Sequence, residues 1–168
     1  MNSVQTRTAI LDEEAVKRKV KRMALEVAEQ HAGEKELIIA GIVGNGETVA
    51  RCMAEELKKI SALEIQVITI QLNKRALAAV TLTPTVEIQD KHIVIVDDVA
   101  NTGKTMFYAL KPFLNFSPKK IQTLALVERS HKMFPIQTDY TGLSIATTLQ
   151  EHITVETEGE RITGAWLY

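Results

Sequence analysis

The stretch HIVIVDDVANTGKTM, residues 92–106, carries the strongest structural signal in the chain. An apolar run ends in two adjacent carboxylates, Asp97 and Asp98, and a small polar loop containing a glycine follows at once. In an open parallel sheet, ligands bind outside the carboxyl ends of the strands. We therefore expect residues 92–97 to form a buried strand whose end carries both acids into a binding site.

The loop after the two acids has the composition of a phosphate-binding loop. Gly103 lies among small and hydroxyl residues, at the point where a helix is expected to begin near Thr102. Free backbone N–H groups and the positive end of a helix attract phosphate. Carboxylates at a strand end can accept hydrogen bonds from sugar hydroxyls or hold a hydrated magnesium ion. Two carboxylates that can accept hydrogen bonds from a pair of sugar hydroxyls, next to backbone amides that can hold a phosphate, match the chemistry of a ribose 5-phosphate.

Other interpretations of these motifs fit the sequence less well. A nucleotide-binding P-loop needs a glycine five residues before the Gly-Lys pair, and Asp98 stands there. Without a P-loop elsewhere, residues 93–98 are not the magnesium strand of an NTPase. The stretch GIVGNGETV, residues 41–49, is a weak dinucleotide fingerprint because Val49 stands at its third glycine. A plain strand end with solvated acids is the remaining alternative.

Length and composition set the broad class of the protein. The 168 residues fit a single domain, residues 1–168, with a real core. The net charge of −1 gives no global basic field that would indicate nucleic acid. Cys52 is the single cysteine, so an internal disulfide is impossible, and a buried structural thiol is expected. Since no apolar run approaches the ~20 residues of a membrane span, we expect a cytoplasmic protein and no membrane partner.

Apolar periodicity predicts alternating strands and helices, and hence an α/β fold with a parallel sheet. Asp12 is the predicted N-cap of the first helix and Gly33 its stop. A helix that begins near Thr102 should end or kink near Pro112. The predicted helices are 12–33 and 47–60, and the predicted strands are 36–43, 63–70, 92–97 and 120–128, with two short strands in the tail 152–168.

Two further segments invite a functional interpretation. Residues 72–91 fit neither the helical nor the strand periodicity of apolar residues well. Their partial alternation of apolar and polar residues predicts an extended flap or hairpin that Pro84 would hold to a sheet edge. Partly irregular segments of this length usually serve a site. A basic cluster on the first helix comprises Lys17, Arg18, Lys19, Lys21 and Arg22. It is a solvated helix face or, alternatively, a contact for RNA or phosphate.

Residues 92–106 resemble the phosphoribosyl-pyrophosphate signature of the type I phosphoribosyltransferases, an apolar strand, two acids and a loop ending in Thr-Gly-x-Thr. The resemblance implies that Asp97 and Asp98 hold the ribose hydroxyls and, indirectly, Mg²⁺. It also implies a 5-phosphate site in the following loop. The residues of that predicted site are Ala100, Asn101, Thr102, Gly103, Lys104 and Thr105.

Two other stretches resemble one subfamily, the bifunctional pyrimidine-operon attenuation regulators and uracil phosphoribosyltransferases. They are AILDEEAVKRKVKRMALEVAE, residues 9–29, and ALVERSHKMFPIQTDYTGLSIATT, residues 125–148. The likeness extends over about residues 8–165, with gaps around 70–90. It implies a type I fold, with a central mostly parallel sheet, flanking helices, a hood and a flexible loop, and a homodimer or higher homo-oligomer.

Base recognition is expected directly after the strand at 120–128, at Glu128, Arg129 and His131. Arg129 could stack on the base or hydrogen-bond to it, and His131 could reach its edge. A surface-loop histidine is an equally good interpretation of His131.

The chain departs from the family pattern in two loops that should face pyrophosphate. The first, Val43, Gly44, Asn45 and Gly46, lacks the usual basic residue. Its backbone amides can still hold an anion, although a plain strand-to-helix turn is the alternative. The flexible loop keeps only Lys74 and Arg75 as cations, which are either catalytic or a solvated loop tip.

Two functions fit these features. The preferred hypothesis is a phosphoribosyltransferase of nucleotide metabolism and pyrimidine salvage, which transfers ribose 5-phosphate from phosphoribosyl pyrophosphate to a nucleobase, with uracil favoured. Its ligands would be phosphoribosyl pyrophosphate, a nucleobase, a nucleoside monophosphate and Mg²⁺. The alternative is a catalytically weak regulatory protein that senses a nucleotide and binds RNA through Lys17–Arg22. A purine transferase is a third option.

Overall fold

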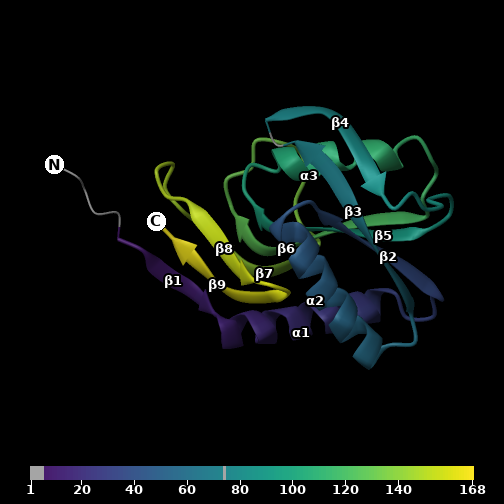
Figure 1. Cartoon of the computed structure of the whole chain (residues 1–168), viewed down its shortest axis with the longest axis horizontal. Coiled ribbons are helices and arrows are strands. Elements are labelled where there is room, and N and C mark those ends of the chain that lie inside the picture. Colours follow the sequence, from purple (N-terminus) through teal and green to yellow (C-terminus); the bar gives the residue numbers. More distant parts are fainter. Residues whose placement is uncertain (1–5, 74) are drawn as a thin grey trace.

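A computed structural model describes residues 6–73 and 75–168, and it confirms the α/β class (Figure 1). The elements are β1 (Thr8–Asp12), α1 (Glu13–Gln30), β2 (Glu36–Ile42), α2 (Asn45–Ile60), β3 (Glu64–Asn73), β4 (Ala76–Thr83), β5 (His92–Ala100), α3 (Lys104–Ala109), the 3-10 helix η1 (Lys111–Phe113), β6 (Lys120–Arg129), β7 (Tyr140–Ile145), β8 (Ile153–Glu158) and β9 (Arg161–Leu167).

The central sheet has the strand order β4-β3-β2-β5-β6-β7. All its neighbouring strands are parallel except β3 and β4, which pair antiparallel. The chain passes from β2 to β3 in one direction along the sheet and from β5 to β6 in the other. The carboxyl ends of β2 and β5, which are neighbours in the sheet, therefore form the switch point at which ligands bind in such folds.

Helices cover both faces of this sheet (Figure 1). On one face, α1 and α2 contribute Met23 and Met53 to a core that includes Leu37 and Val94. On the other face, α3 and η1 contribute Met106 and Phe113 to a second core. Because alternate residues of a strand point to opposite faces, a strand buried on both sides is apolar throughout. This explains the continuous apolar runs of β2 and β5.

A small antiparallel sheet, β1-β9-β8, completes the fold. It confirms the two strands predicted in the tail 152–168. The pairing of β1 with β9, in which Thr8 lies opposite Leu167 and Asp12 opposite Gly164, was not predicted. A five-residue strand whose partner lies about 150 residues later leaves little local signal. The polar start of the chain, residues 1–5, lies outside the described residues.

Several boundaries differ from the predictions. The side chain of Asp12 caps α1 as expected, by accepting a hydrogen bond from the backbone N–H of Ala15. Strand β5 runs on to Ala100 instead of ending at residue 97, because its last residues stay paired with β6. Helix α2 begins at Asn45, earlier than predicted, and α3 begins at Lys104. Strand β7 was not predicted.

Residues 72–91 form the end of β3, the edge strand β4 and an irregular return to β5. The hairpin alternative is therefore confirmed, and Pro84 follows directly after the edge strand. The side chain of Lys111 donates to the carbonyl oxygen of Ala78 at 2.9 Å and so ties β4 to η1. Lys74 lies outside the described residues.

The end of α1 should make stability depend on pH. His31 is buried, its Nδ1 lies 2.9 Å from the carbonyl oxygen of Val27, and its ring meets that of His92 edge to face. Burial lowers the pKa of His31 below 6.5. A lowered pKa means that protons bind the unfolded chain more readily, so stability present above pH ~6.5 is lost as the pH falls.

We therefore expect the free energy of unfolding in urea to fall between pH 7.5 and pH 5. The variant His31→Asn should lose part of that fall, whereas His152→Asn, at an exposed histidine, should keep all of it. An identical pH dependence in the three proteins would show that His31 is not responsible.

Candidate functional site

Asp97 and Asp98 lie in the last part of β5, at the switch point of the sheet. Asp97 is 2% exposed, and its Oδ1 accepts a hydrogen bond from the backbone N–H of Asp98 at 2.9 Å. Asp98 is half-buried, and its Oδ1 accepts from the backbone N–H of Val99 at 2.9 Å. Both carboxylates are thus held by backbone donors in positions set by the strand.

The loop that follows β5 wraps a small hollow. Gly103 has a φ of +86°, and a Cβ placed there would lie 2.8 Å from Cγ2 of Ile136, so only glycine fits without distortion. The Oγ1 of Thr102 accepts a hydrogen bond from the backbone N–H of Lys104 at 3.3 Å. The hollow has a volume of about 100 Å³ and is lined by Asp97, Val99, Ala100, Asn101, Thr102, Gly103, Lys104, Thr105 and Met106.

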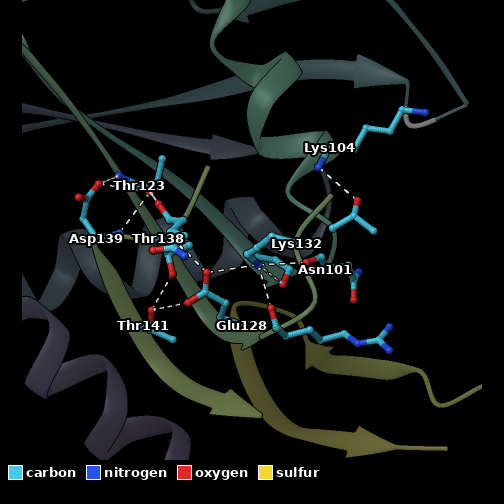
Figure 2. Close-up of polar contacts among 12 residues, drawn as sticks. Asn101, Lys104, Thr123, Glu128, Lys132, Thr138, Asp139 and Thr141 are labelled. Atoms are coloured by element: carbon cyan, nitrogen blue, oxygen red, sulfur yellow. Dashed lines mark hydrogen bonds and ion pairs between the residues drawn. The ribbon is translucent and has the colours of Figure 1, made fainter. Parts of the chain in front are cut away.

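Lys132 braces the backbone of this loop, as Figure 2 shows. Its ammonium group donates to the carbonyl oxygens of Ala100 at 3.1 Å, Asn101 at 3.0 Å and Arg129 at 3.0 Å. It also pairs with the Glu128 carboxylate at 3.2 Å, and the two side chains are only 15% and 14% exposed. The largely buried ammonium group of Lys132 therefore ties the loop after β5 to the end of β6.

The backbone after Lys132 adds to this brace. The N–H groups of Met133 and Phe134 both donate to the carbonyl oxygen of Thr102, at 2.9 and 3.1 Å. The sequence prediction did not include Lys132, which reads as an ordinary surface lysine. The sequence places it in the segment that resembles the family, but nothing local indicates that its partners are main-chain oxygens some thirty residues earlier.

Glu128 is the anionic partner of the brace. It accepts hydrogen bonds from the backbone N–H of Thr138 and the hydroxyl of Thr141, both at 3.2 Å (Figure 2). Burial by itself would raise the pKa of Glu128, but the donors on Thr138 and the charge of Lys132 outweigh it and lower the pKa below the usual value. Glu128 is therefore ionised near neutral pH.

The loop after β2, residues 43–46, is held in place by the side chain of Glu47. The N–H of Gly44, whose φ is +94°, donates to Oε2 of Glu47 at 2.9 Å. The hydroxyl of Thr69 on β3 donates to Oε1 of the same carboxylate at 2.8 Å. Gly46 packs close to Asp97, since a Cβ there would lie 3.2 Å from Oδ1 of Asp97. Glu47, which follows the loop directly, was not among the residues predicted for the site.

Asn45 joins this loop to β5 and β8. Its amide nitrogen donates to Oδ2 of Asp98 at 3.2 Å and to the carbonyl oxygen of Val155 at 2.8 Å. Its amide oxygen accepts from the hydroxyl of Thr157 at 3.3 Å. The structure thus brings together Asn45 and Asp98, which were both predicted site residues but in different loops.

Three further residues of the described chain were predicted for the site: Arg75, Arg129 and His131. Arg75 lines a hollow of about 330 Å³ with Lys104, Tyr108 and Lys111, next to the loop after β5. The guanidinium of Arg129 donates to the carbonyl oxygen of Thr148 at 2.9 Å. His131 is exposed.

Within residues 6–73 and 75–168, no three His, Cys, Asp or Glu side chains gather where they could hold a metal ion. The carboxylates of Asp97 and Asp98 nevertheless suit magnesium, which prefers oxygen ligands and usually keeps several waters or substrate oxygens. These two residues would hold the ion only with such help.

Comparison of the chain with known protein families identifies its family. A family model described as the phosphoribosyl transferase domain matches residues 6–158. The chain belongs to the phosphoribosyltransferase family. The match includes β5, the loop after it, β6 and Lys132, so the site described above lies inside the family domain.

Curated relatives agree with this assignment. The chain is 35% identical to the bifunctional protein PyrR of Ligilactobacillus salivarius, over 87% of this chain and 89% of the relative. It is 32% identical to that of Clostridium kluyveri, over 91% and 92%. The subfamily resemblance of the sequence is therefore confirmed.

Solved structures confirm the type I fold. The hypoxanthine phosphoribosyltransferase of Trypanosoma cruzi superposes with a TM-score of 0.73 at 16% identity, over 83% of this chain and 82% of the other. The hypoxanthine-guanine phosphoribosyltransferase of Bacillus anthracis superposes with a TM-score of 0.69 at 21% identity, over 88% and 87%. At these identities the likeness concerns the fold alone.

The basic cluster on α1 is partly committed to internal contacts. Lys17 pairs with Glu13 and Glu14. Arg22 pairs with Glu26 at 2.6 Å and donates to the carbonyl oxygens of residues 141 and 142 on β7, both at 2.8 Å. Arg22 thus secures the edge strand β7.

None of the helices in the described part of the chain combines the length and the apolar character that crossing a membrane requires.

Proposed function

We propose that the protein transfers ribose 5-phosphate from phosphoribosyl pyrophosphate to a nucleobase, with release of pyrophosphate, and that the base is uracil. The observation that carries the proposal is the pair Asp97 and Asp98 beside a glycine loop at the switch point, in a chain of the phosphoribosyltransferase family. The likeness to bifunctional PyrR proteins favours a pyrimidine.

The ribose 5-phosphate is assigned to the hollow after β5. Its phosphate would accept hydrogen bonds from the N–H groups of residues 100–105 and from the hydroxyls of Thr102 and Thr105. Its ring hydroxyls would donate to Asp97 and Asp98. Because the strand and the Lys132 brace fix these groups before the ligand arrives, little ordering cost accompanies binding.

The base is assigned to the end of β6, where Arg129 and His131 can reach it. The carboxylate of Glu128 is already bonded to Lys132 and Thr138. In this proposal Glu128 therefore positions the loop after β5 instead of contacting the base.

The reaction replaces the bond from the anomeric carbon to pyrophosphate by a bond to a base nitrogen. Such displacements pass through an oxocarbenium-like transition state, so the chain's task is to position both reactants and to stabilise charge. Mg²⁺, when bound, supplies Lewis-acid and template chemistry. Asp97 and Asp98 orient the ribose, and Lys74 and Arg75 are the cations proposed to meet the departing pyrophosphate.

The test is a coupled assay of pyrophosphate release with phosphoribosyl pyrophosphate, Mg²⁺ and one of five bases. Uracil should give the fastest release, ahead of cytosine, guanine, hypoxanthine and xanthine, and removal of Mg²⁺ should stop it. Release with a purine only would move the protein to the purine transferases. No release with any base would remove the enzyme proposal.

The second candidate is a regulatory protein that senses a nucleoside monophosphate. The observation that favours it is the loop after β2, where Glu47 and Asn45 already use their polar groups on the protein. RNA binding through the α1 cluster belongs to this candidate, with the exposed Arg18 and Lys21 as contacts. A cytoplasmic homodimer or larger homo-oligomer of single-domain chains fits both candidates, and sedimentation velocity would measure its size.

Replacing both Lys74 and Arg75 by alanine should abolish pyrophosphate release while changing the affinity for UMP less than about twofold. Only the departing pyrophosphate needs these charges, and UMP carries no pyrophosphate. The matched control is Lys119→Ala, an exposed lysine that pairs with Glu34. Full activity of the double variant would remove both residues from the proposed catalytic machinery.

A further inference from the structure

Glu47 directly follows residues 43–46, the loop that the family resemblance predicts to face pyrophosphate. Its Oε2 accepts from the N–H of Gly44 at 2.9 Å, and its Oε1 accepts from the hydroxyl of Thr69 at 2.8 Å. The carboxylate therefore bridges the loop after β2 to β3 with both oxygens. An anion supplied by the chain itself already takes a backbone donor that a nest for a free anion would offer.

The charge balance of this loop is unfavourable to a second anion. Residues 43–46 contain no basic residue, and Glu47 adds a negative charge directly after them. Like charges a few ångströms apart repel most strongly where water is partly excluded, and Glu47 is not fully exposed. Pyrophosphate, which carries several negative charges, therefore meets repulsion instead of the usual countercharge.

Sterics do not produce this exclusion. A Cβ placed on Gly44 would meet no heavy atom within 4 Å, so the outer corner of the loop is open. The amide of Asn45 is turned toward Asp98 and Val155, and within residues 43–47 the one charged side chain is that of Glu47. Whatever selection the loop exerts must come mainly from charge.

We propose that Glu47 is a specificity-determining residue: its carboxylate acts as a built-in anion in the pyrophosphate subsite, so the site prefers a nucleoside 5′-monophosphate to phosphoribosyl pyrophosphate. This inference rests on the proposed function, which places the ribose 5-phosphate after β5. It assigns the discrimination to a single side chain that lies outside the phosphate loop.

The test replaces Glu47 by glutamine, which keeps an oxygen for the N–H of Gly44 but removes the charge. Calorimetric titrations with UMP, with phosphoribosyl pyrophosphate and with inorganic pyrophosphate are run at fixed Mg²⁺ on the full chain. We expect about a tenfold gain in affinity for both pyrophosphate-containing ligands and less than a twofold change for UMP. Glu55→Gln, an exposed acid on the same helix, removes one charge without touching the loop and should change none of the three.

Equal changes for all ligands, or no gain for the pyrophosphate-containing ligands, would overturn the role of Glu47. If the glutamine variant does not fold, Glu47→Ala is judged by the same titrations. The proposed function fails separately: a parent protein that does not bind UMP disproves the ribose 5-phosphate site. A gain for inorganic pyrophosphate in that case would still support the subsite.

Discussion

Replacement of Lys132 by methionine should destabilise the protein by about 3–5 kcal/mol, because it leaves the largely buried carboxylate of Glu128 without its cation. Methionine keeps most of the side-chain volume, so packing should change little. The carbonyl oxygens of Ala100 and Asn101 lose their donor at the same time. The loop should then become less ordered, and the affinity for UMP should fall at least about tenfold.

Two controls separate the lost charge pair from a general effect of removing a lysine. Lys119→Met affects a lysine that is 59% exposed and pairs with Glu34, and it should cost less than about 1 kcal/mol. The double variant Lys132→Met/Glu128→Gln removes the uncompensated charge and should recover part of the stability. Urea denaturation of the three variants measures these differences. A cost below about 1 kcal/mol for Lys132→Met itself would contradict the brace.

Gly103→Ala is expected to have the largest effect on ligand binding. The φ of +86° costs a residue with a Cβ roughly 1–2 kcal/mol, and the added methyl group would lie 2.8 Å from Cγ2 of Ile136. Relief of that contact must move the loop or residues 134–136, of which Phe134 donates its backbone N–H to the carbonyl oxygen of Thr102. We expect a loss of about a hundredfold in UMP affinity, measured by calorimetry, because the amides around a bound phosphate would no longer converge.

The matched control for this prediction is Gly159→Ala, in the turn between β8 and β9. Gly159 also has a positive φ, +60°, but a Cβ there would meet no heavy atom within 4 Å. It should show a similar backbone cost in stability and unchanged UMP affinity. If both alanine variants bind UMP like the parent, the loop after β5 does not hold the phosphate.

Four strands of the central sheet, β2, β3, β5 and β6, were predicted from the sequence because their signal is local. A strand buried on both faces carries a continuous apolar run, and such runs lie at 37–42 in β2, 93–96 in β5 and 124–127 in β6. The signature at residues 92–106 combined such a strand with acids and a glycine turn, so the fold and the candidate phosphate loop followed from it together.

Long-range pairing explains what the sequence did not predict. Strand β1 exists because β9 returns beside it, and β5 continues past Asp97 because Val99 and Ala100 stay paired with β6. Likewise, Lys132 and Glu47 look like ordinary surface charges until the fold brings their partners close. Lys132 donates to the carbonyl oxygens of Ala100 and Asn101, and Glu47 accepts from Thr69 on β3; no local pattern identifies these distant partners.

The crystal structure of the complex with UMP tests the ribose 5-phosphate site most directly. We predict that the 5′-phosphate lies within hydrogen-bonding distance of the backbone N–H groups of residues 100–105. The ribose hydroxyls should lie within the same distance of Asp97 or Asp98. A complex formed at saturating UMP in which this loop is empty and the phosphate is bound elsewhere would contradict the assignment.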